Sequence, residues 1–490
     1  MNQKEVLKRY FGYDEFRPPQ DEIISHVLAG RDALVLMPTG GGKSLCYQIP
    51  ALIFPNLTLV ISPLISLMKD QVDALNGMGI PAAFINSSLE YDDIQRVQVR
   101  VNEGRIKILY VAPERLAAAS TSEWFKDLKL SLIAVDEAHC ISEWGHDFRP
   151  EYRNLQFLRG RYPNVPILAL TATATERVRE DIIRLLNLVG GKTFTSSFNR
   201  PNLSYVVRPK QKAFAGLVDT LKQHKDESVI IYCFSRKDTE KLAEDLRTEG
   251  FTAAAYHAGL DPATRAKVQD RFIRDQINII TATIAFGMGI NKPDVRLVVH
   301  YDLPKSIEGY YQETGRAGRD GLPAECVLFF TYADTRKHRY FIDQMDEGPE
   351  KTNVLVKLEQ VLRYGQSSTC RRAQLLAHFG EKLVGSCENC DVCVPRSFAT
   401  TEWKSLLKPA SGPMDDALFQ KLREVRKRIA GERHVPAYMI FGDKSLKDMA
   451  EKKPRDHAAF AKIHGVGAAK LESLADPFLA VINAHVKMEA

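Results

Sequence analysis

One segment, residues 33–47, constrains the fold of this chain more than any other. It consists of an apolar run, a turn with the three glycines Gly40, Gly41 and Gly42, and a stretch that can start a helix. Glycine lets successive backbone N–H groups converge on an anion, and the N-terminus of a helix adds positive potential. The segment therefore predicts a strand, a turn and a helix that together bind phosphate.

The polar residues of this turn predict a nucleotide site. Lys43 would place its ammonium group beside the β- and γ-phosphates, and the hydroxyl of Ser44 would ligate Mg²⁺. The expected ligands of ATP in this turn are Thr39, Gly40, Gly41, Gly42, Lys43 and Ser44. The strict pattern G-x-x-x-x-G-K-[ST] is not met, because Met37 stands where its first glycine would be. A glycine-rich surface turn beside an ordinary lysine is the alternative.

Two adjacent carboxylates follow a later apolar run. Acids at the end of a strand can meet a phosphate site at the carboxyl edge of a parallel sheet. We therefore expect Asp136 to hold Mg²⁺ and Glu137 to position or deprotonate the attacking water. His139 is expected to link this site to Thr171 and Thr173, which follow the next apolar run. Without the glycine turn upstream, these acids would be more typical of a solvated helix start.

Two arginines further along the chain, Arg316 and Arg319, predict the source of positive charge for hydrolysis. They lie three residues apart, which places them on one face if the segment is helical. Arginine usually supplies positive charge to the γ-phosphate as charge redistributes. We predict that Arg319 is this arginine finger and that Arg316 lies at the same interface. The alternative is a basic helix that ends in an Asp-Gly turn.

Apolar runs alternate with helical stretches in two successive parts of the chain, which predicts α/β units with mainly parallel sheets. The first part includes residues 57–61, 106–111 and 165–170, and the pattern starts again at residues 228–233. The glycine turn belongs to the first part and the two arginines to the second. We therefore expect a nucleotide bound in a cleft between two domains.

The eight cysteines fall into two groups. Cys370, Cys387, Cys390 and Cys393 include two overlapping C-x₂-C steps, which predict a tetrahedral thiolate site for structural zinc. An iron–sulfur cluster is the main alternative for four thiolates. The other four cysteines are scattered and are expected to be buried as small apolar residues.

The motifs, taken in order, resemble those of RecQ-family DNA helicases of superfamily 2. The three strings at residues 37–44, 136–139 and 312–321 are accompanied by family-like segments at residues 62–71, 112–115, 232–236 and 285–294. The resemblance covers nearly the whole chain. It implies an α/β protein with two RecA-like parallel-sheet domains, a small helical zinc-binding domain and a C-terminal all-helical HRDC-like domain. The expected ranges are 1–205, 206–340, 341–396 and 414–490, with a linker at 397–413.

The resemblance also implies roles that the spacing alone leaves open. Arg17 and Gln20 lie in a segment similar to the family's adenine-reading segment. The aromatic-rich loop after His139 resembles the loop that senses single-stranded DNA, so stacking and phosphate contacts are expected there. The expected DNA-binding residues are Trp144, His146, Phe148 and Arg149. Packing of the aromatic rings within the first domain is the alternative. The resemblance also favours zinc at the four cysteines.

The stretch after Pro395 departs from the family. Many members have a winged-helix domain of about a hundred residues here, whereas residues 396–413 are all that precedes the C-terminal region of this chain. That region combines apolar residues at helical spacing with many basic residues, which predicts DNA contact, although a solvated helix surface would look the same. We expect unwinding of simple 3′-tailed duplexes and weak engagement of junctions or quadruplexes.

The resemblance thus implies an ATP-dependent DNA helicase that moves 3′ to 5′ on single-stranded DNA and acts in repair and recombination. A translocase that remodels protein–DNA complexes without separating strands is one alternative, and a non-hydrolysing DNA-binding scaffold is another. The net charge of +6 permits a polyanionic partner. Expected partners are single-stranded and tailed duplex DNA, with a single-stranded-DNA-binding protein or other repair proteins as candidates. No apolar stretch approaches the ~20 residues of a membrane span, so we expect a cytoplasmic protein, associated with the nucleoid if bacterial.

Overall fold

A computed structural model describes most of the chain. The described residues are 1–63, 65–119, 123–145, 147–286, 292–394, 415–433 and 435–489. His146, the predicted linker at 397–413 and residues 287–291 of one family-like segment lie outside them. Within these ranges, no helix has the length and apolar character needed to cross a membrane.

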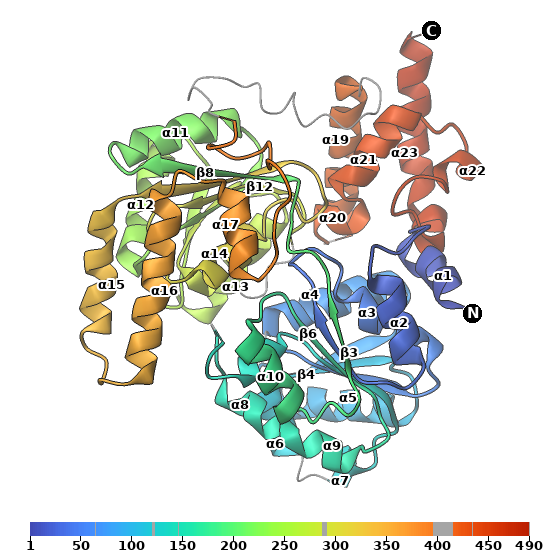
Figure 1. Cartoon of the computed structure of the whole chain (residues 1–490). Coiled ribbons are helices and arrows are strands. Elements are labelled where there is room, and N and C mark those ends of the chain that lie inside the picture. Colours follow the sequence, from blue (N-terminus) through green and yellow to red (C-terminus); the bar gives the residue numbers. More distant parts are fainter. Residues whose placement is uncertain are drawn as a thin grey trace. The chain divides into compact units, whose positions relative to one another are not determined.

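The first domain is built on a seven-stranded parallel sheet (Figure 1, blue to green). Its strands are β1 (Ala33–Leu36), β2 (Leu57–Ile61), β3 (Ala82–Ile85), β4 (Ile108–Val111), β5 (Leu130–Val135), β6 (Ile167–Thr171) and β7 (Lys192–Thr195), in the order β3-β4-β2-β5-β6-β1-β7. The central strands are buried along their whole length, because both faces of a parallel sheet are covered.

Helices and short turns connect these strands. They are α1 (Gln3–Val6), η1 (Leu7–Phe11), α2 (Gln20–Leu28), α3 (Leu45–Ile53), α4 (Ile65–Gly77), α5 (Tyr91–Asn102), α6 (Pro113–Ala119), α7 (Glu123–Lys126), η2 (Ala138–Ile141), α8 (Pro150–Arg153), η3 (Asn154–Gln156), α9 (Phe157–Arg161) and α10 (Glu176–Leu185). Helices α2, α3 and α4 contribute apolar side chains to one core together with β1, β2, β4, β5 and β6. This core fixes the glycine turn between β1 and α3.

The second domain has a six-stranded parallel sheet in the order β10-β11-β9-β12-β13-β8. Its elements are β8 (Leu203–Pro209), α11 (Ala213–Gln223), β9 (Ser228–Tyr232), α12 (Arg236–Thr248), β10 (Ala253–Tyr256), α13 (Pro262–Ile273), β11 (Ile279–Ala282), η4 (Ile284–Phe286), β12 (Val295–His300), α14 (Ile307–Thr314), β13 (Ala324–Phe330) and η5 (Tyr332–Asp334). The predicted boundary at residue 205 falls inside β8, which pairs with β13. The second domain therefore starts earlier, and the chain divides after Ser197.

Three helices precede or surround the cysteine cluster: α15 (Thr335–Ile342), α16 (Pro349–Gln366) and α17 (Arg371–His378). Cys390 forms an isolated parallel bridge with Tyr205 of β8. The ring of Phe379, just after α17, stacks on Phe198 with the ring centroids 4.7 Å apart. The cysteine cluster is thus attached directly to the second sheet.

The C-terminal region is all helical in its described part, as predicted. Its helices are α19 (Asp416–Glu432), α20 (Ala437–Ile440), α21 (Asp443–Lys452), α22 (His457–Phe460) and α23 (Ala468–Glu489). The apolar residues that predicted the first of these helices, Leu418, Leu422, Val425 and Ile429, are buried.

A glycine hairpin between α22 and α23 packs on the N-terminal segment of the first domain. The N–H of Gly465 donates to the carbonyl oxygen of Gly12 at 3.3 Å. A Cβ atom added at Gly12 would lie 2.6–2.7 Å from the hairpin backbone, and one added at Gly467 would lie 3.0 Å from the carbonyl oxygen of Arg9. The two backbones therefore approach each other without intervening side chains, which requires glycine.

Candidate active site

The glycine turn lies at the carboxyl end of β1, where it was predicted. Gly40 and Gly42 have φ angles of +80° and +86°, a region that side chains rarely permit. A Cβ atom at Gly41 would lie 2.9 Å from the carbonyl oxygen of Pro38. Lys43 donates from Nζ to the carbonyl oxygen of Met37 at 3.1 Å. The three glycines are thus needed for the backbone path of the turn.

The ends of the turn connect it to β1 and α3. Thr39 lies on its β1 side, and Ser44 is the N-cap residue of α3, which begins at Leu45. The predicted phosphate ligands therefore form one continuous segment that leads into a helix N-terminus, as anion binding requires.

The two residues predicted to read adenine contact the glycine turn directly. Gln20, at the start of α2, donates from Nε2 to the carbonyl oxygen of Gly42 at 3.1 Å, and its Oε1 accepts from the N–H of Arg17 at 2.9 Å. The Arg17 guanidinium donates to the carbonyl oxygen of Gly40 at 3.1 Å. A Cβ atom at Gly42 would lie 2.4 Å from Gln20 Nε2. The N-terminal segment and the turn are therefore one hydrogen-bonded unit.

The two predicted catalytic carboxylates follow β5. In the sheet β5 adjoins β6, and β6 adjoins β1, all in parallel. Their carboxyl ends therefore share one edge. Burial, and then repulsion by Glu137, raise the pKa of Asp136 to about 7, against the attraction of Lys43. The two adjacent carboxylates are a donor set that fits a hard cation such as Mg²⁺.

Glu137 adopts an unusual backbone conformation. Its φ angle is +47°, in the left-handed region that costs free energy for a residue with a side chain. Its N–H donates to Oδ1 of Asp136 at 3.0 Å, and its Oε2 lies 3.4 Å from Nδ1 of His139. Such strain is common at functional sites. The strand end therefore holds both acids in a fixed arrangement.

His139 contacts the threonine segment after β6, as predicted. Its Nδ1 lies 2.9 Å from Oγ1 of Thr171. The Thr171 hydroxyl donates to the carbonyl oxygen of Thr173 at 3.1 Å and accepts from the Thr173 N–H at 3.2 Å. A hydroxyl has one proton, so the imidazole donates from Nδ1 in this arrangement. A chain of hydrogen bonds thus runs from His139, two residues after Glu137, to Thr171 and Thr173.

The aromatic-rich loop is held by the predicted Arg149 and by two arginines that the sequence did not predict, Arg153 and Arg177. The Arg177 guanidinium on α10 lies 3.2 Å from the ring centroid of Trp144, and Arg153 lies 5.3 Å from that of Phe148. Arg149 pairs with Asp147 at 3.2 Å and donates to the carbonyl oxygen of Pro63 at 3.1 Å. Arg177 and Pro63 are distant from the loop in sequence, and no local pattern marks them.

We expect Trp144→Ala to weaken binding of single-stranded DNA about tenfold, because loss of one stacked base costs about 1–3 kcal/mol. Fluorescence anisotropy with a labelled oligonucleotide would measure the Kd. Trp124→Ala is the matched control, since Trp124 is a half-buried tryptophan whose indole donates to Asn102, away from the loop. Equal Kd values for Trp144→Ala and Trp124→Ala would contradict a stacking role for Trp144.

The two predicted arginines of the second domain lie in a loop and not on a helix. Helix α14 ends at Thr314, so the condition that placed both on one helical face is not met. Arg316 is only 5% exposed and its side chain lies within the second domain. Arg319 is partly exposed. The loop geometry thus distinguishes the two arginines, which the spacing did not.

Side chains from before β8 hold this loop. Arg200 donates to the carbonyl oxygens of Ala317 and Gly318 at 2.9 and 2.8 Å. Asn202 donates to those of Gly318 and Leu322 at 2.9 and 2.8 Å. These residues are more than a hundred positions away in sequence, so the sequence offered no signal for them. They fix the backbone from which Arg319 projects.

The four clustered cysteines come together as predicted. The Sγ atoms of Cys370, Cys387, Cys390 and Cys393 all lie within 4.8 Å of one another. Backbone N–H groups donate to three of these sulfur atoms at 3.4–3.5 Å. Zinc prefers four thiolates in a tetrahedron at about 2.3 Å each. The cluster therefore fits a structural zinc ion, since the four protein ligands leave no position for water.

Two arginines next to the first cysteine of the cluster form hydrogen bonds and an ion pair inside the protein. Arg371 pairs with Asp391 at 3.0 Å and donates to the carbonyl oxygen of Tyr364 at 2.7 Å. Arg372 donates to the carbonyl oxygen of Leu203 at 2.6 Å. Both are buried, so they join the cysteine cluster to the second sheet.

The scattered cysteines behave as predicted. Cys46, Cys140, Cys233 and Cys326 are buried and free of disulfides. Burial raises the pKa of Cys46 to about 12, so this thiol stays neutral and acts as a small apolar residue.

Family models match four successive parts of the chain. They are the DEAD/DEAH box helicase (residues 17–182), the helicase conserved C-terminal domain (210–321), RecQ zinc-binding (332–394) and the HRDC domain (415–482). The chain is also 40% identical to the ATP-dependent DNA helicase RecQ of Pasteurella multocida (strain Pm70), over 99% of this chain and 94% of that one. The chain belongs to the RecQ family. The ATP-dependent DNA helicase RecQ of Bacillus subtilis (strain 168) is 35% identical over 99% of this chain and 98% of that one.

The alignment with these RecQ relatives is consistent with the expected lack of a winged-helix domain. The alignment with the Pasteurella multocida protein spans 593 positions, although this chain has 490 residues. The relative therefore has residues that this chain lacks. Residues 395–414 separate the zinc-binding and HRDC matches here, which is too short for a further domain of ordinary size.

A solved structure shares the fold. The DNA-bound crystal structure of the DUF1998 helicase MrfA aligns with a TM-score of 0.56 at 19% identity, over 79% of this chain and 59% of that one. At this identity the likeness concerns the architecture of parallel-sheet domains alone.

Proposed function

We propose that this RecQ-family chain is an ATP-dependent DNA helicase that moves 3′ to 5′ along single-stranded DNA and separates duplexes during repair and recombination. The observation that carries the proposal is that the glycine turn with Lys43 and the acids Asp136 and Glu137 follow β1 and β5 at the same edge of one parallel sheet. It occurs in a chain 40% identical over nearly its whole length to a protein named as an ATP-dependent DNA helicase.

In this proposal the first domain holds ATP. The N–H groups of the glycine turn and Lys43 bind the phosphates, while Arg17 and Gln20 orient the adenine end. Ser44 and Asp136 would hold Mg²⁺, which neutralises phosphate charge when bound. Glu137 orients the attacking water and accepts its proton.

Arg319 supplies the second domain's contribution to this reaction. Its guanidinium stabilises the charge that develops on the γ-phosphate oxygens. Arg316 supports the same loop from inside its domain. This assignment keeps the sequence-based choice of Arg319 as the finger and gives Arg316, which is buried, a supporting role.

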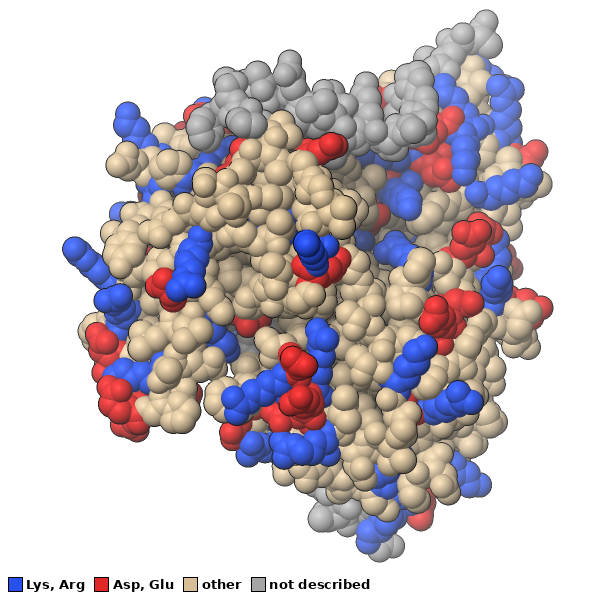
Figure 2. Space-filling model, viewed as in Figure 1, with Lys and Arg blue, Asp and Glu red and all other residues tan. Residues whose placement is uncertain are grey.

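DNA is proposed to act through the aromatic-rich loop. Trp144 and Phe148 stack on bases, and Arg149 contacts phosphate. The hydrogen bonds from His139 to Thr171 and on to Thr173 lead to the end of β6, which adjoins β1 and the glycine turn, and they are the proposed coupling path. On the face shown in Figure 2, Lys and Arg are interspersed with Asp and Glu among the described residues. Stacking by Trp144 and Phe148 is expected to contribute to DNA binding beside the phosphate contact of Arg149.

The proposed setting is the cytoplasm, on nucleoid DNA if the host is bacterial. A single-stranded-DNA-binding protein is the first candidate for a protein partner, because it occupies the same strand as the motor. A pull-down with purified components would test this interaction directly.

We expect ATP-dependent strand separation of a 3′-tailed duplex, little separation of a 5′-tailed or blunt duplex, and weak activity on junctions and quadruplexes. The physical reason is that residues 395–414, between the zinc-binding and HRDC matches, are too few for the winged-helix domain, which the family resemblance implies grips duplex DNA. A strand-displacement assay across these substrates measures it. Strong junction unwinding would contradict the narrow range, and DNA-stimulated hydrolysis without strand separation would favour a translocase.

A further inference from the structure

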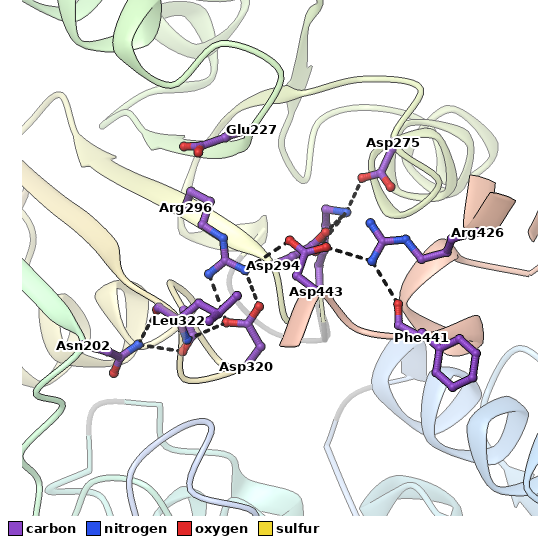
Figure 3. Close-up of polar contacts among 12 residues, drawn as sticks. Asn202, Glu227, Asp275, Asp294, Arg296, Asp320, Leu322, Arg426, Phe441 and Asp443 are labelled. Atoms are coloured by element: carbon purple, nitrogen blue, oxygen red, sulfur yellow. Dashed lines mark hydrogen bonds and ion pairs between the residues drawn. The ribbon is translucent and has the colours of Figure 1, made fainter. Parts of the chain in front are cut away.

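A buried chain of charged side chains connects the HRDC-like region to the loop that carries Arg319. Arg426 on α19 pairs with Asp443, the first residue of α21, at 2.8 Å. The other carboxylate oxygen of Asp443 lies 3.5 Å from Arg296 on β12. Arg296 in turn pairs through both terminal nitrogens with Asp320. Figure 3 shows these four side chains in one continuous row.

The four side chains are largely buried, so each charge depends on its neighbours in the row for compensation. The exposed fractions of the side chains are 4% for Arg426, 16% for Asp443, 11% for Arg296 and 6% for Asp320. Burial alone would lower the pKa of Arg296, but Asp320 and then Asp443 raise it. A buried ion pair that loses one partner leaves an uncompensated charge. Removal of Asp443 would therefore disturb Arg296.

A nearby acid does not replace Asp443. Asp294 also adds to the raised pKa of Arg296, after Asp320 and Asp443. It is engaged by Lys292 at 3.1 Å, and Lys292 pairs with Asp275 at 2.5 Å. Asp443 is further fixed by Arg426, which donates to the carbonyl oxygen of Phe441 at 2.9 Å. Arg426 thus holds the Asp443 carboxylate in place beside Arg296.

Asp320 connects Arg296 to the loop that carries Arg319. It follows Arg319 in the chain, its Oδ1 accepts from the N–H of Leu322 at 3.1 Å, and its own N–H donates to the carbonyl oxygen of Pro293 at 3.3 Å. Arg200 and Asn202 hold the same loop through Gly318. The pair of Asp320 and Arg296 therefore attaches the loop to β12 at the position next to Arg319.

We propose that Asp443 is a positioning residue for the arginine finger: through Arg296 and Asp320, the HRDC-like region sets the position of Arg319 and thereby the rate of ATP hydrolysis. The proposal rests on the assignment of Arg319 in the proposed function. It gives this region a role in the motor's chemistry that does not depend on DNA contact.

The test compares full-length variants in steady-state ATP hydrolysis with saturating single-stranded DNA. Asp443→Asn is expected to lower kcat about tenfold, because a small misplacement of a catalytic group costs up to about a hundredfold. The KM for ATP should stay unchanged, since the glycine turn and Gln20 belong to the first domain. Asp443→Glu, which keeps the charge, should restore much of kcat. Glu432→Gln is the control, because Glu432 forms an exposed pair with Arg428 in the same region and should behave as wild type.

A second pair of measurements separates positioning from mere stabilisation. In an Arg296→Gln background, Asp443→Asn should have no further effect on kcat, because both act through one path. Thermal unfolding of each variant shows whether it is folded. A kcat of Asp443→Asn within twofold of wild type, or independent effects of the two substitutions, would overturn the proposal.

Arg319→Ala separates a failure of the finger assignment from a failure of the positioning role of Asp443. If it abolishes hydrolysis while Asp443→Asn turns over normally, the finger assignment stands and the positioning role is wrong. If Arg319→Ala keeps wild-type turnover, the finger assignment fails and the positioning proposal fails with it.

Discussion

Lys43→Ala is expected to lower DNA-stimulated ATP hydrolysis by about a hundredfold or more, because loss of one preorganised charge at a developing transition state costs about that much. Glu137→Gln should lower it by about a hundredfold to ten-thousandfold, the usual contribution of a general base. Phosphate release from ATP, with and without single-stranded DNA, measures both rates.

The two substitutions should differ in binding. Lys43→Ala removes a phosphate ligand, so the Kd for ATP should rise. Glu137→Gln keeps the size of the side chain and changes proton transfer, so ATP binding should be retained. Lys192→Ala and Glu103→Gln are suitable controls, because both residues form exposed pairs in the first domain and such pairs contribute little. Wild-type hydrolysis by both site variants would refute the assignment of the site.

The second large effect concerns the cysteine cluster. Cys390→Ser is expected to abolish zinc binding and to destabilise the region from α16 to residue 394. The reason is that a structural zinc site contributes its binding free energy to folding. Cys390 is also buried and bridges to β8, so its loss affects the second sheet as well.

Elemental analysis and thermal unfolding measure these changes. The wild type should contain one zinc ion per chain, and a strong chelator should lower its unfolding temperature. Cys233→Ala is the control, because Cys233 is a buried free cysteine outside the cluster and its loss should leave the zinc content unchanged. Iron in place of zinc would show that the thiolates hold an iron–sulfur cluster.

Local motifs predicted the parts of the site that the chain forms within short segments. The glycine turn, the acids after β5 and the cysteine cluster each depend on residues close in sequence, so spacing was sufficient. His139 and Thr171 were also paired correctly, because each follows an apolar run that becomes a neighbouring strand. Parallel strands bring their carboxyl ends together, and this rule needs no further information.

The errors have a different physical origin. The predicted domain boundary at residue 205 falls inside β8, because the sequence of a strand does not indicate which sheet the strand joins. The condition that would place Arg316 and Arg319 on one helical face is not met, because α14 ends at Thr314. Arg177, Arg200 and Arg296 were missed since their partners lie far along the chain. Such contacts depend on the packed fold, which local spacing does not encode.

The glycine hairpin before α23 limits which C-terminal regions can be combined with this N-terminal domain. Gly12 and the backbone of residues 465–467 meet so closely that no side chain fits between them. A substitution on either side therefore demands a compensating shift on the other. A hybrid that joins this N-terminal domain to the C-terminal region of a relative would keep the contact only if glycine occupied the position equivalent to 467. The two ends of the chain are thus expected to evolve as a matched pair.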